Sequence, residues 1–141
     1  MDELAPLLPH IDWFVPNDDE AERFTGHADP RQQLRALQKC GANTIIITRG
    51  GHGAVAARRK QMWECGAYRM NTVDPSGSGD AFTAGVITGI AREWDFPRTL
   101  RYASALGTSA TRAVGTTDGV FTAAEAEAFV KANPFEVREI S

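Results

Sequence analysis

The run Thr44-Ile45-Ile46-Ile47-Thr48 limits the possible folds of this chain more than any other segment. Three consecutive isoleucines with no polar residue between them predict a strand that is covered on both faces. Strands of that kind belong to parallel sheets with helices packed on both sides. The run therefore predicts an α/β protein.

Signals for another strand and two helices precede this run. A short apolar segment from Ile11 to Val15 predicts a strand, and Pro16-Asn17 followed by three acidic residues predicts the start of a helix. A second helix is predicted to begin at Asp29-Pro30 and to end at Gly41. Alternation of strands and helices predicts a layered α/β fold with a parallel sheet.

The second half of the chain is predicted to be mainly helical. Glycine-rich residues 49–53 predict a turn, the segments 54–58 and 61–67 a β-hairpin, and residues 68–73 a further extended segment. Helices are predicted over residues 80–92, about 98–113, and 122–131, the last with the capping box Thr122-x-x-Glu125.

Composition narrows the class of protein. A length of 141 residues is typical of one domain, and a net charge of −3 gives no basic surface for nucleic acid. Cys40 and Cys65 lack metal-binding spacing and indicate free thiols in a reducing cytoplasm. No apolar run approaches the length of about 18 residues typical of a membrane span, so we expect a cytoplasmic protein without a membrane partner.

The glycine-rich segment Asp74-Pro75-Ser76-Gly77-Ser78-Gly79-Asp80 carries the strongest functional signal. Glycines at 77 and 79 allow backbone conformations that other residues rarely adopt, and the helix that follows directs free N–H groups into the loop. Such a loop can bind a phosphoryl group, and a carboxylate beside it can accept a proton. The alternative is a solvated turn with Ser78 or Asp80 as the helix N-cap.

The composition of the following helix favours the anion site. Ala81, Gly85 and Gly89 form a stripe of small residues at a spacing of four, beside larger apolar residues at the same spacing. Two glycines in a helix cost roughly 1 kcal/mol each relative to alanine, so close packing is expected to compensate for them. A loop that leads into a buried helix is not typical of a surface turn.

Two further motifs each have two interpretations. Asn17 and Glu20 fit a capping box at a helix start, or water-mediated binding of Mg2+ beside two phosphates. The loop Thr48-Arg49-Gly50-Gly51-His52-Gly53 is a common kind of turn, but it leaves a buried strand at its carboxyl end, where open parallel sheets bind ligands. Neither a P-loop motif nor G-x-G-x-x-G is present.

Taken in order, three motifs resemble the C-terminal half of ribokinase-like (PfkB) sugar kinases. They are Pro16-Asn17-x-x-Glu20, Thr48-x-Gly50-x-x-Gly53 and Asp74-x-x-Gly77-x-Gly79-Asp80, and the resemblance extends from about Ile11 to Thr117. It implies a three-layer (αβα) Rossmann-like, ribokinase-like fold with a mostly parallel sheet that is incomplete at one edge. It also implies a single domain over residues 1–141, the nucleotide-binding and catalytic half of such a kinase.

The resemblance also implies roles for individual residues. Asp80 matches the catalytic base, and Gly77, Ser78 and Gly79 match the anion hole for the transferred phosphoryl group. The remaining implied roles are nucleotide binding by Thr48, Arg49, Gly50, Gly53 and Ser104, binding of Mg2+ by Asn17 and Glu20 through water, and binding of a monovalent cation such as K+ by Asp74 and Ser76. The family often has asparagine in place of Ser104 and alanine in place of Ser78.

These matches imply an ATP-dependent carbohydrate kinase that acts on a sugar hydroxyl. Members of the family are longer, and their N-terminal half carries the sugar-binding motif and the lid, so we expect those parts to be missing from this chain. The alternative function is a truncated, non-catalytic nucleotide-binding or assembly module. The expected partners are ATP, a small sugar, and either a second copy of the chain or the missing N-terminal half, because an unpaired sheet edge invites association.

Overall fold

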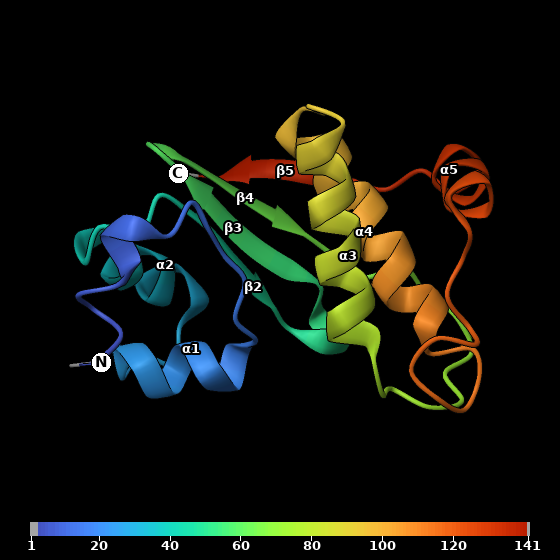
Figure 1. Cartoon of the computed structure of the whole chain (residues 1–141), viewed down its shortest axis with the longest axis horizontal. Helices are drawn as coiled ribbons and strands as arrows, with labels where there is room; N and C mark the ends of the chain where they lie inside the picture. The colour runs from blue at the N-terminus through green and yellow to red at the C-terminus, as the bar shows by residue number, and fades with distance from the viewer. Residues whose placement is uncertain (1–2, 141) are drawn as a thin grey trace. The chain divides into compact units, whose positions relative to one another are not determined.

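The structure, a computed structural model, describes residues 3–140 and divides into two compact units. The first unit extends to Glu64 and takes up the chain again at Arg138, and the second is Cys65–Val137. Figure 1 shows the elements of each unit, which are described here separately. The expectation of a single domain stays a prediction.

A five-stranded sheet forms the framework of the first unit. Its strand order is β1 (Trp13–Phe14), β2 (Thr44–Thr48), β3 (Ala54–Arg58), β4 (Gln61–Cys65) and β5 (Val137–Ile140). β1 and β2 are parallel, but β2 and β3 are antiparallel, so the sheet is mixed. The reason is the short connection from Arg49 to Gly53, because a parallel pair needs a crossover of a dozen residues or more.

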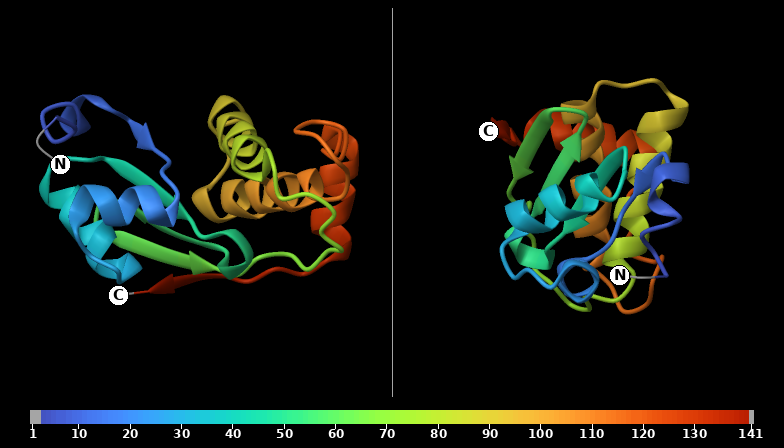
Figure 2. Two further views of the ribbon diagram at one scale, coloured as in Figure 1. Left: turned by 90° about the horizontal axis from the view of Figure 1, so that it is seen from below. Right: turned by 90° about the vertical axis from the view of Figure 1, so that its left-hand side faces the viewer.

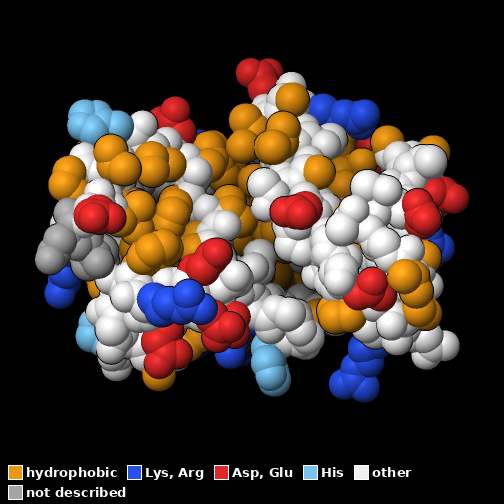
Figure 3. Space-filling view, turned by 60° about the horizontal axis from the view of Figure 1, so that its bottom comes forward, with side chains coloured by type: hydrophobic (Ala, Val, Ile, Leu, Met, Phe, Trp, Pro, Cys, Tyr) orange, Lys and Arg blue, Asp and Glu red, His pale blue; other side chains and the backbone are white. Residues whose placement is uncertain are grey.

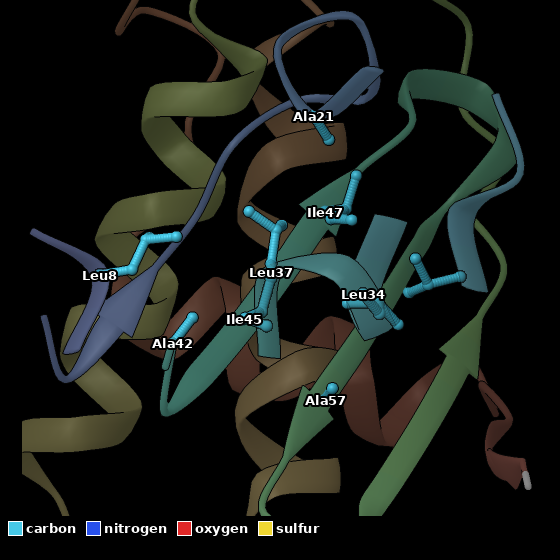
Figure 4. Packing of buried hydrophobic residues seen from close by; sticks show 9 residues of the cluster. Leu8, Ala21, Leu34, Leu37, Ala42, Ile45, Ile47 and Ala57 are labelled. Atoms are coloured by element: carbon cyan, nitrogen blue, oxygen red, sulfur yellow. The ribbon is translucent and has the colours of Figure 1, made fainter. Parts of the chain in front are cut away.

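Helices α1 (Asp18–Thr25) and α2 (Pro30–Lys39) pack against β2 and enclose the core of this unit. Leu34 and Leu37 of α2 face Ile45 and Ile47 of β2, and all four side chains are fully buried (Figure 4). Ile46, whose side chain points to the opposite face of the sheet, is equally buried. The prediction of a strand without a solvent-facing side is therefore confirmed for β2.

Two closely packed helices, α3 (Ser78–Ala91) and α4 (Phe96–Ala110), dominate the second unit (Figures 1 and 2). A Cβ atom added at Gly85 would lie 2.5 Å from the Cα of Ala103, and one added at Gly89 would overlap the side chain of Thr99. The small-residue stripe predicted to be buried therefore lies at the α3–α4 contact. A third helix, α5 (Ala123–Ala132), packs on α4.

We expect Gly85→Ala to destabilise the protein although alanine is the better helix former. The gain in helix propensity is about 1 kcal/mol, whereas overlap with the α4 backbone costs about 1 to 3 kcal/mol. Urea unfolding measures the difference. Gly79→Ala in the same helix is the control, since a Cβ there has no atom within 4 Å. Equal stability of the two variants would contradict the close approach.

Several boundaries differ from the predicted ones. β1 contains two residues rather than five, and residues 68–73 form no strand, because Val73 N–H donates to the carbonyl of Thr111 instead of to a neighbouring strand. α3 begins at Ser78, which places Asp80 inside its first turn. β5 was not predicted at all, since Val137-Arg138-Glu139-Ile140 carries no clear alternation.

The surface carries charges of both signs. On the face shown in Figure 3, lysine and arginine side chains are scattered among carboxylates and apolar groups. Among residues 3–140, no helix combines the length and the apolar character that a membrane crossing needs.

Candidate active site

In the first unit, the candidate residues lie at the carboxyl ends of the parallel strands β1 and β2. Asn17 and Thr48 form a parallel bridge, and the Thr48 N–H donates to the carbonyl of Pro16 at 3.0 Å. This pairing brings two of the three sequence motifs side by side. It also places them at the sheet edge where ligands bind in open α/β folds.

The side chains of Asn17 and Glu20 form a capping box at the start of α1. Asn17 Oδ1 accepts the N–H of Glu20 at 2.8 Å, and Glu20 Oε2 accepts the N–H of Asn17 at 2.9 Å. The helix-start interpretation is thus confirmed. The cap uses one oxygen of each side chain, so it is compatible with a second role in which Glu20 contacts water around a metal ion.

The loop from Arg49 to Gly53 is closed by its own backbone hydrogen bonds and exposes residues 50–52. It contains the 3-10 turn η2 (Gly50–His52), and its ends are joined by a bond from Arg49 N–H to the Gly53 carbonyl at 2.8 Å. Gly50 and Gly53 have positive φ values of 51° and 83°. A Cβ at Gly50 or Gly51 would have no atom within 4 Å, so a ligand can approach the backbone there.

In the second unit, the N-terminus of α3 differs from those of the other four α-helices among residues 3–140. Asn17, Asp29, Asp95 and Thr122 each cap a helix by accepting a backbone N–H, whereas α3 has Gly77 at the N-cap and no side-chain cap. The interpretation of Ser78 or Asp80 as the N-cap is wrong. The N–H groups of Gly79 and Asp80 precede the first helical bond, from Ala81 N–H to Gly77 carbonyl, and are directed into the loop.

The two loop glycines have different functions. Gly77 has φ +77°, and a Cβ there would lie 2.7 Å from the carbonyl oxygen of Thr116, so both its conformation and its surroundings require glycine. Gly79 is helical without a positive φ, and a Cβ there would have no atom within 4 Å. The prediction that Gly79 is needed for backbone freedom is therefore wrong. Its lack of a side chain leaves open space above the first turn of α3.

Asp80 is exposed in the first turn of α3, three residues after the N-cap. The positive end of the helix stabilises a carboxylate there. The hydroxyl of Thr83, one turn further on, donates its proton to the Gly79 carbonyl at 3.0 Å and so is not free to donate to a ligand beside Asp80. The position gives Asp80 an accessible carboxylate beside the open amides.

Asp74 closes the other end of the loop. Its Oδ1 accepts the N–H of Ser76 at 2.9 Å, and its Oδ2 accepts the N–H of Gly115 at 3.3 Å. Hydrogen bonds from Ser76, followed by the one from the Gly115 amide, lower the pKa of the Asp74 carboxyl. An ionised carboxylate fits either a bound cation or this hydrogen-bonded turn.

A segment after α4 contacts this loop. The Thr111 carbonyl accepts the N–H groups of Val73 and Asp74 at 2.7 and 3.2 Å, and Thr116 packs against Gly77. Ser104 is buried within α4, and Gly107, one turn further on, approaches the carbonyl of Ser78.

The donor set limits what metal can bind. Residues 3–140 contain no group of three or more histidine, cysteine or acidic side chains arranged to hold a metal ion. Mg2+ suits such a chain, since it keeps several waters and takes few protein ligands when it binds together with phosphates. The amides at the start of α3, and those of Gly50 and Gly51, are available to the phosphates themselves, whereas the amides of Arg49, His52 and Gly53 donate within their own loop.

Residues 1–123 match the model of the pfkB family of carbohydrate kinases. The chain is 33% identical over 106 residues to fructoselysine 6-kinase from Shigella flexneri, covering 73% of this chain and 36% of that protein. It is 30% identical over 133 residues to 2-dehydro-3-deoxygluconokinase from Bacillus subtilis, covering 94% of this chain and 40% of that protein.

Solved structures show the same fold. A protein from Escherichia coli assigned as ribokinase II, in complex with ATP and Mg2+, matches with a TM-score of 0.84 and 27% identity over 94% of this chain and 43% of that one. Ribokinase from Arabidopsis thaliana, complexed with ribose and ATP, matches in fold with a TM-score of 0.82 at 23% identity, over 90% of this chain and 43% of that one. The chain thus spans about two fifths of these structures.

Proposed function

The chain belongs to the pfkB family of carbohydrate kinases, and from this we propose that it carries the nucleotide-binding and catalytic half of an ATP-dependent sugar kinase. The observation that carries the proposal is the uncapped N-terminus of α3, where open amides lie beside the exposed carboxylate of Asp80. A site that binds the transferring phosphoryl group, next to a base that accepts the proton of the attacking hydroxyl, is the arrangement that phosphoryl transfer to an alcohol needs.

In the proposed reaction, Asp80 accepts the proton of the sugar hydroxyl as the oxygen attacks the γ-phosphorus of ATP. The bond from that phosphorus to the bridging oxygen breaks, and ADP leaves. Amides of Gly79 and Asp80 donate hydrogen bonds to the oxygens of the transferring group, and Gly77 and Ser78 shape the turn that directs them. Stabilisation of developing charge by fixed donors is the largest contribution expected from such a loop.

We assign the remaining candidates to the nucleotide and the cations. Thr48, Arg49, Gly50 and Gly53 of the first unit, and Ser104 of the second, would contact ATP. Mg2+, when bound, neutralises phosphate charge, and Asn17 and Glu20 would hold it through water. Asp74 and Ser76 would hold a monovalent cation such as K+, with the low pKa of Asp74 favouring the charged form that a cation requires.

Substitution of Glu20 by Gln tests the role in Mg2+ binding separately from capping. Glutamine can still accept the Asn17 N–H, so the helix start is preserved, but the charge toward the metal is lost. We expect the Mg2+ concentration that half-saturates ATP binding to rise roughly tenfold, as for other residues that act through metal-bound water. Calorimetric titration with ATP at stepped Mg2+ concentrations measures it.

The matched control is Glu125→Gln in the capping box of α5, where Glu125 Oε2 accepts the Thr122 N–H at 2.7 Å. The two variants remove the same charge from the same kind of helix start. If both showed the same Mg2+ dependence as the original protein, Glu20 would be a capping residue and nothing more.

A non-catalytic nucleotide-binding module is the second candidate, and the observation behind it is the coverage of only 36 to 43% of the matching proteins. The roles proposed for the candidate residues are binding of phosphate, nucleotide and cations and acceptance of a proton, and none of these residues is assigned to the sugar. We therefore expect these 141 residues alone to bind MgATP weakly, to self-associate or bind a partner polypeptide, and to release no ADP in response to sugars. Light scattering and a coupled ADP assay over a sugar panel test this. Sugar-dependent turnover by a monomer would contradict it.

A further inference from the structure

The segment 111–121, which follows α4, holds the Asp74–Gly77 turn at three places within the second unit. The Thr111 carbonyl accepts the N–H groups of Val73 and Asp74, and the Gly115 N–H donates to Asp74 Oδ2. Thr116 packs so closely against Gly77 that no Cβ fits between them. The shape of the turn before α3 therefore depends on where this segment lies.

One side chain, Arg112, ties the segment to itself and to the end of α4. Its Nε donates to the carbonyls of Gly119 at 3.0 Å and Ser109 at 3.3 Å, and its Nη2 donates to the Gly119 carbonyl at 2.5 Å. The guanidinium carbon lies 4.3 Å from the centre of the Phe121 ring. The planar fork with several donors is specific to arginine, since a lysine ammonium can lie over an aromatic ring but cannot reproduce the fork.

The far end of the segment is fixed by buried contacts. The hydroxyl of Ser109 is fully buried, donates to the Leu106 carbonyl at 2.8 Å and accepts the Phe121 N–H at 3.0 Å. A Cβ at Gly119 would lie 2.7 Å from the Ser109 carbonyl oxygen. With Gly119 and Phe121 fixed on α4, Arg112 closes residues 112–119 into a loop whose tip, Gly115-Thr116, rests on the Asp74–Gly77 turn.

We propose that Arg112 is a positioning residue for phosphoryl transfer, which acts by holding the Gly115-Thr116 tip against the turn that directs the amides of Gly79 and Asp80. The catalytic consequence rests on the proposed function, whereas the mechanical link between Arg112 and the turn does not. An exposed arginine that stacks on a neighbouring ring without this consequence is the simpler alternative. The two differ in what happens to the amides of the turn when Arg112 is replaced.

Amide hydrogen exchange by NMR separates them. In Arg112→Ala we expect the N–H groups of Gly115, Val73 and Asp74 to exchange roughly tenfold faster or more, because Thr111 and Gly115, on either side of Arg112, are no longer held against the turn. Amides in the middle of α3 and α4 should keep their protection. Arg112→Lys, which retains the charge without the fork, should recover only part of the protection and guards against a fold lost in the alanine variant.

Arg92→Ala is the matched control, because Arg92 also lies over a ring in this unit, 5.3 Å from the centre of Trp94, and pairs with Glu127 at the surface. It should leave Gly115, Val73 and Asp74 unchanged. Unchanged exchange in Arg112→Ala, full recovery in Arg112→Lys, or equal acceleration throughout both helices would each overturn the proposal. If the original protein did not bind MgATP in calorimetry, the proposed function would be refuted. The exchange result would still decide whether Arg112 holds the Asp74–Gly77 turn in place.

Discussion

Replacement of Asp80 by Asn is expected to lower the rate of phosphoryl transfer by about 100-fold or more, with ATP affinity changed only a few-fold. Asparagine keeps the size and the exposed position in the first turn of α3 but cannot accept a proton at neutral pH. The loss therefore falls on kcat and kcat/KM together, as expected for an interaction made in the transition state. The measurement is steady-state turnover in a form of the protein that includes the sugar-binding half.

Asp95→Asn is the matched control for the loss of charge. Asp95 caps α4 by accepting the Arg98 N–H at 2.8 Å, and asparagine caps a helix equally well. Its turnover should equal that of the original protein. Near-normal turnover of the Asp80 variant would remove Asp80 from the mechanism and would leave the open amides as an anion site without a base.

Gly77→Ala is expected to reduce stability by about 2 to 5 kcal/mol, the sum of two separate costs. A left-handed conformation at φ +77° costs a residue with a Cβ about 1 to 2 kcal/mol, and overlap with Thr116 adds about 1 to 3 kcal/mol. Because relief of the overlap would push the 112–119 loop away, transfer activity should fall as well. Urea unfolding and turnover measure the two effects.

Gly26→Ala isolates the conformational cost, since Gly26 has nearly the same φ of +73° but a Cβ there would have no atom within 4 Å. The loss of stability in Gly26→Ala should stay near the conformational cost alone, about 1 to 2 kcal/mol. Gly79→Ala completes the series: we expect little change in stability but impaired transfer, and more impairment than in Ser78→Ala, because the new methyl group enters the open space above the amides. The opposite order would assign the function to the Ser78 hydroxyl.

The local elements of this fold could be predicted from sequence because their determinants are local. The starts of α1 and α5 are each predicted by a capping box, Asn17 with Glu20 and Thr122 with Glu125, whose two residues lie three positions apart. The isoleucine run marked β2 to the residue. β5 could not be found in this way, because its place in the sheet depends on β4, more than 70 residues earlier, and not on its own pattern.

The part of the candidate site that is local in sequence could be predicted, and the part that depends on contacts between distant residues could not. The candidate loop consists of consecutive residues, so the segment from Asp74 to Asp80 and the positive φ of Gly77 could be predicted. The contacts that Thr111, Gly115 and Thr116 make with that loop could not, because they join positions about 40 apart, and the groups on the 111–116 side are backbone atoms, which any residue type would supply. The Cβ space at Gly79 likewise depends on neighbours that a sequence does not display.

The second unit interrupts the first one in sequence. The chain leaves the first unit after Glu64 and re-enters it at Arg138, and these two residues are joined by an ion pair of 3.1 Å. The second unit is therefore an insertion whose entry and exit points are adjacent. Adjacent ends allow such an insert to be excised and its host closed by a short linker, or to be transplanted into another host.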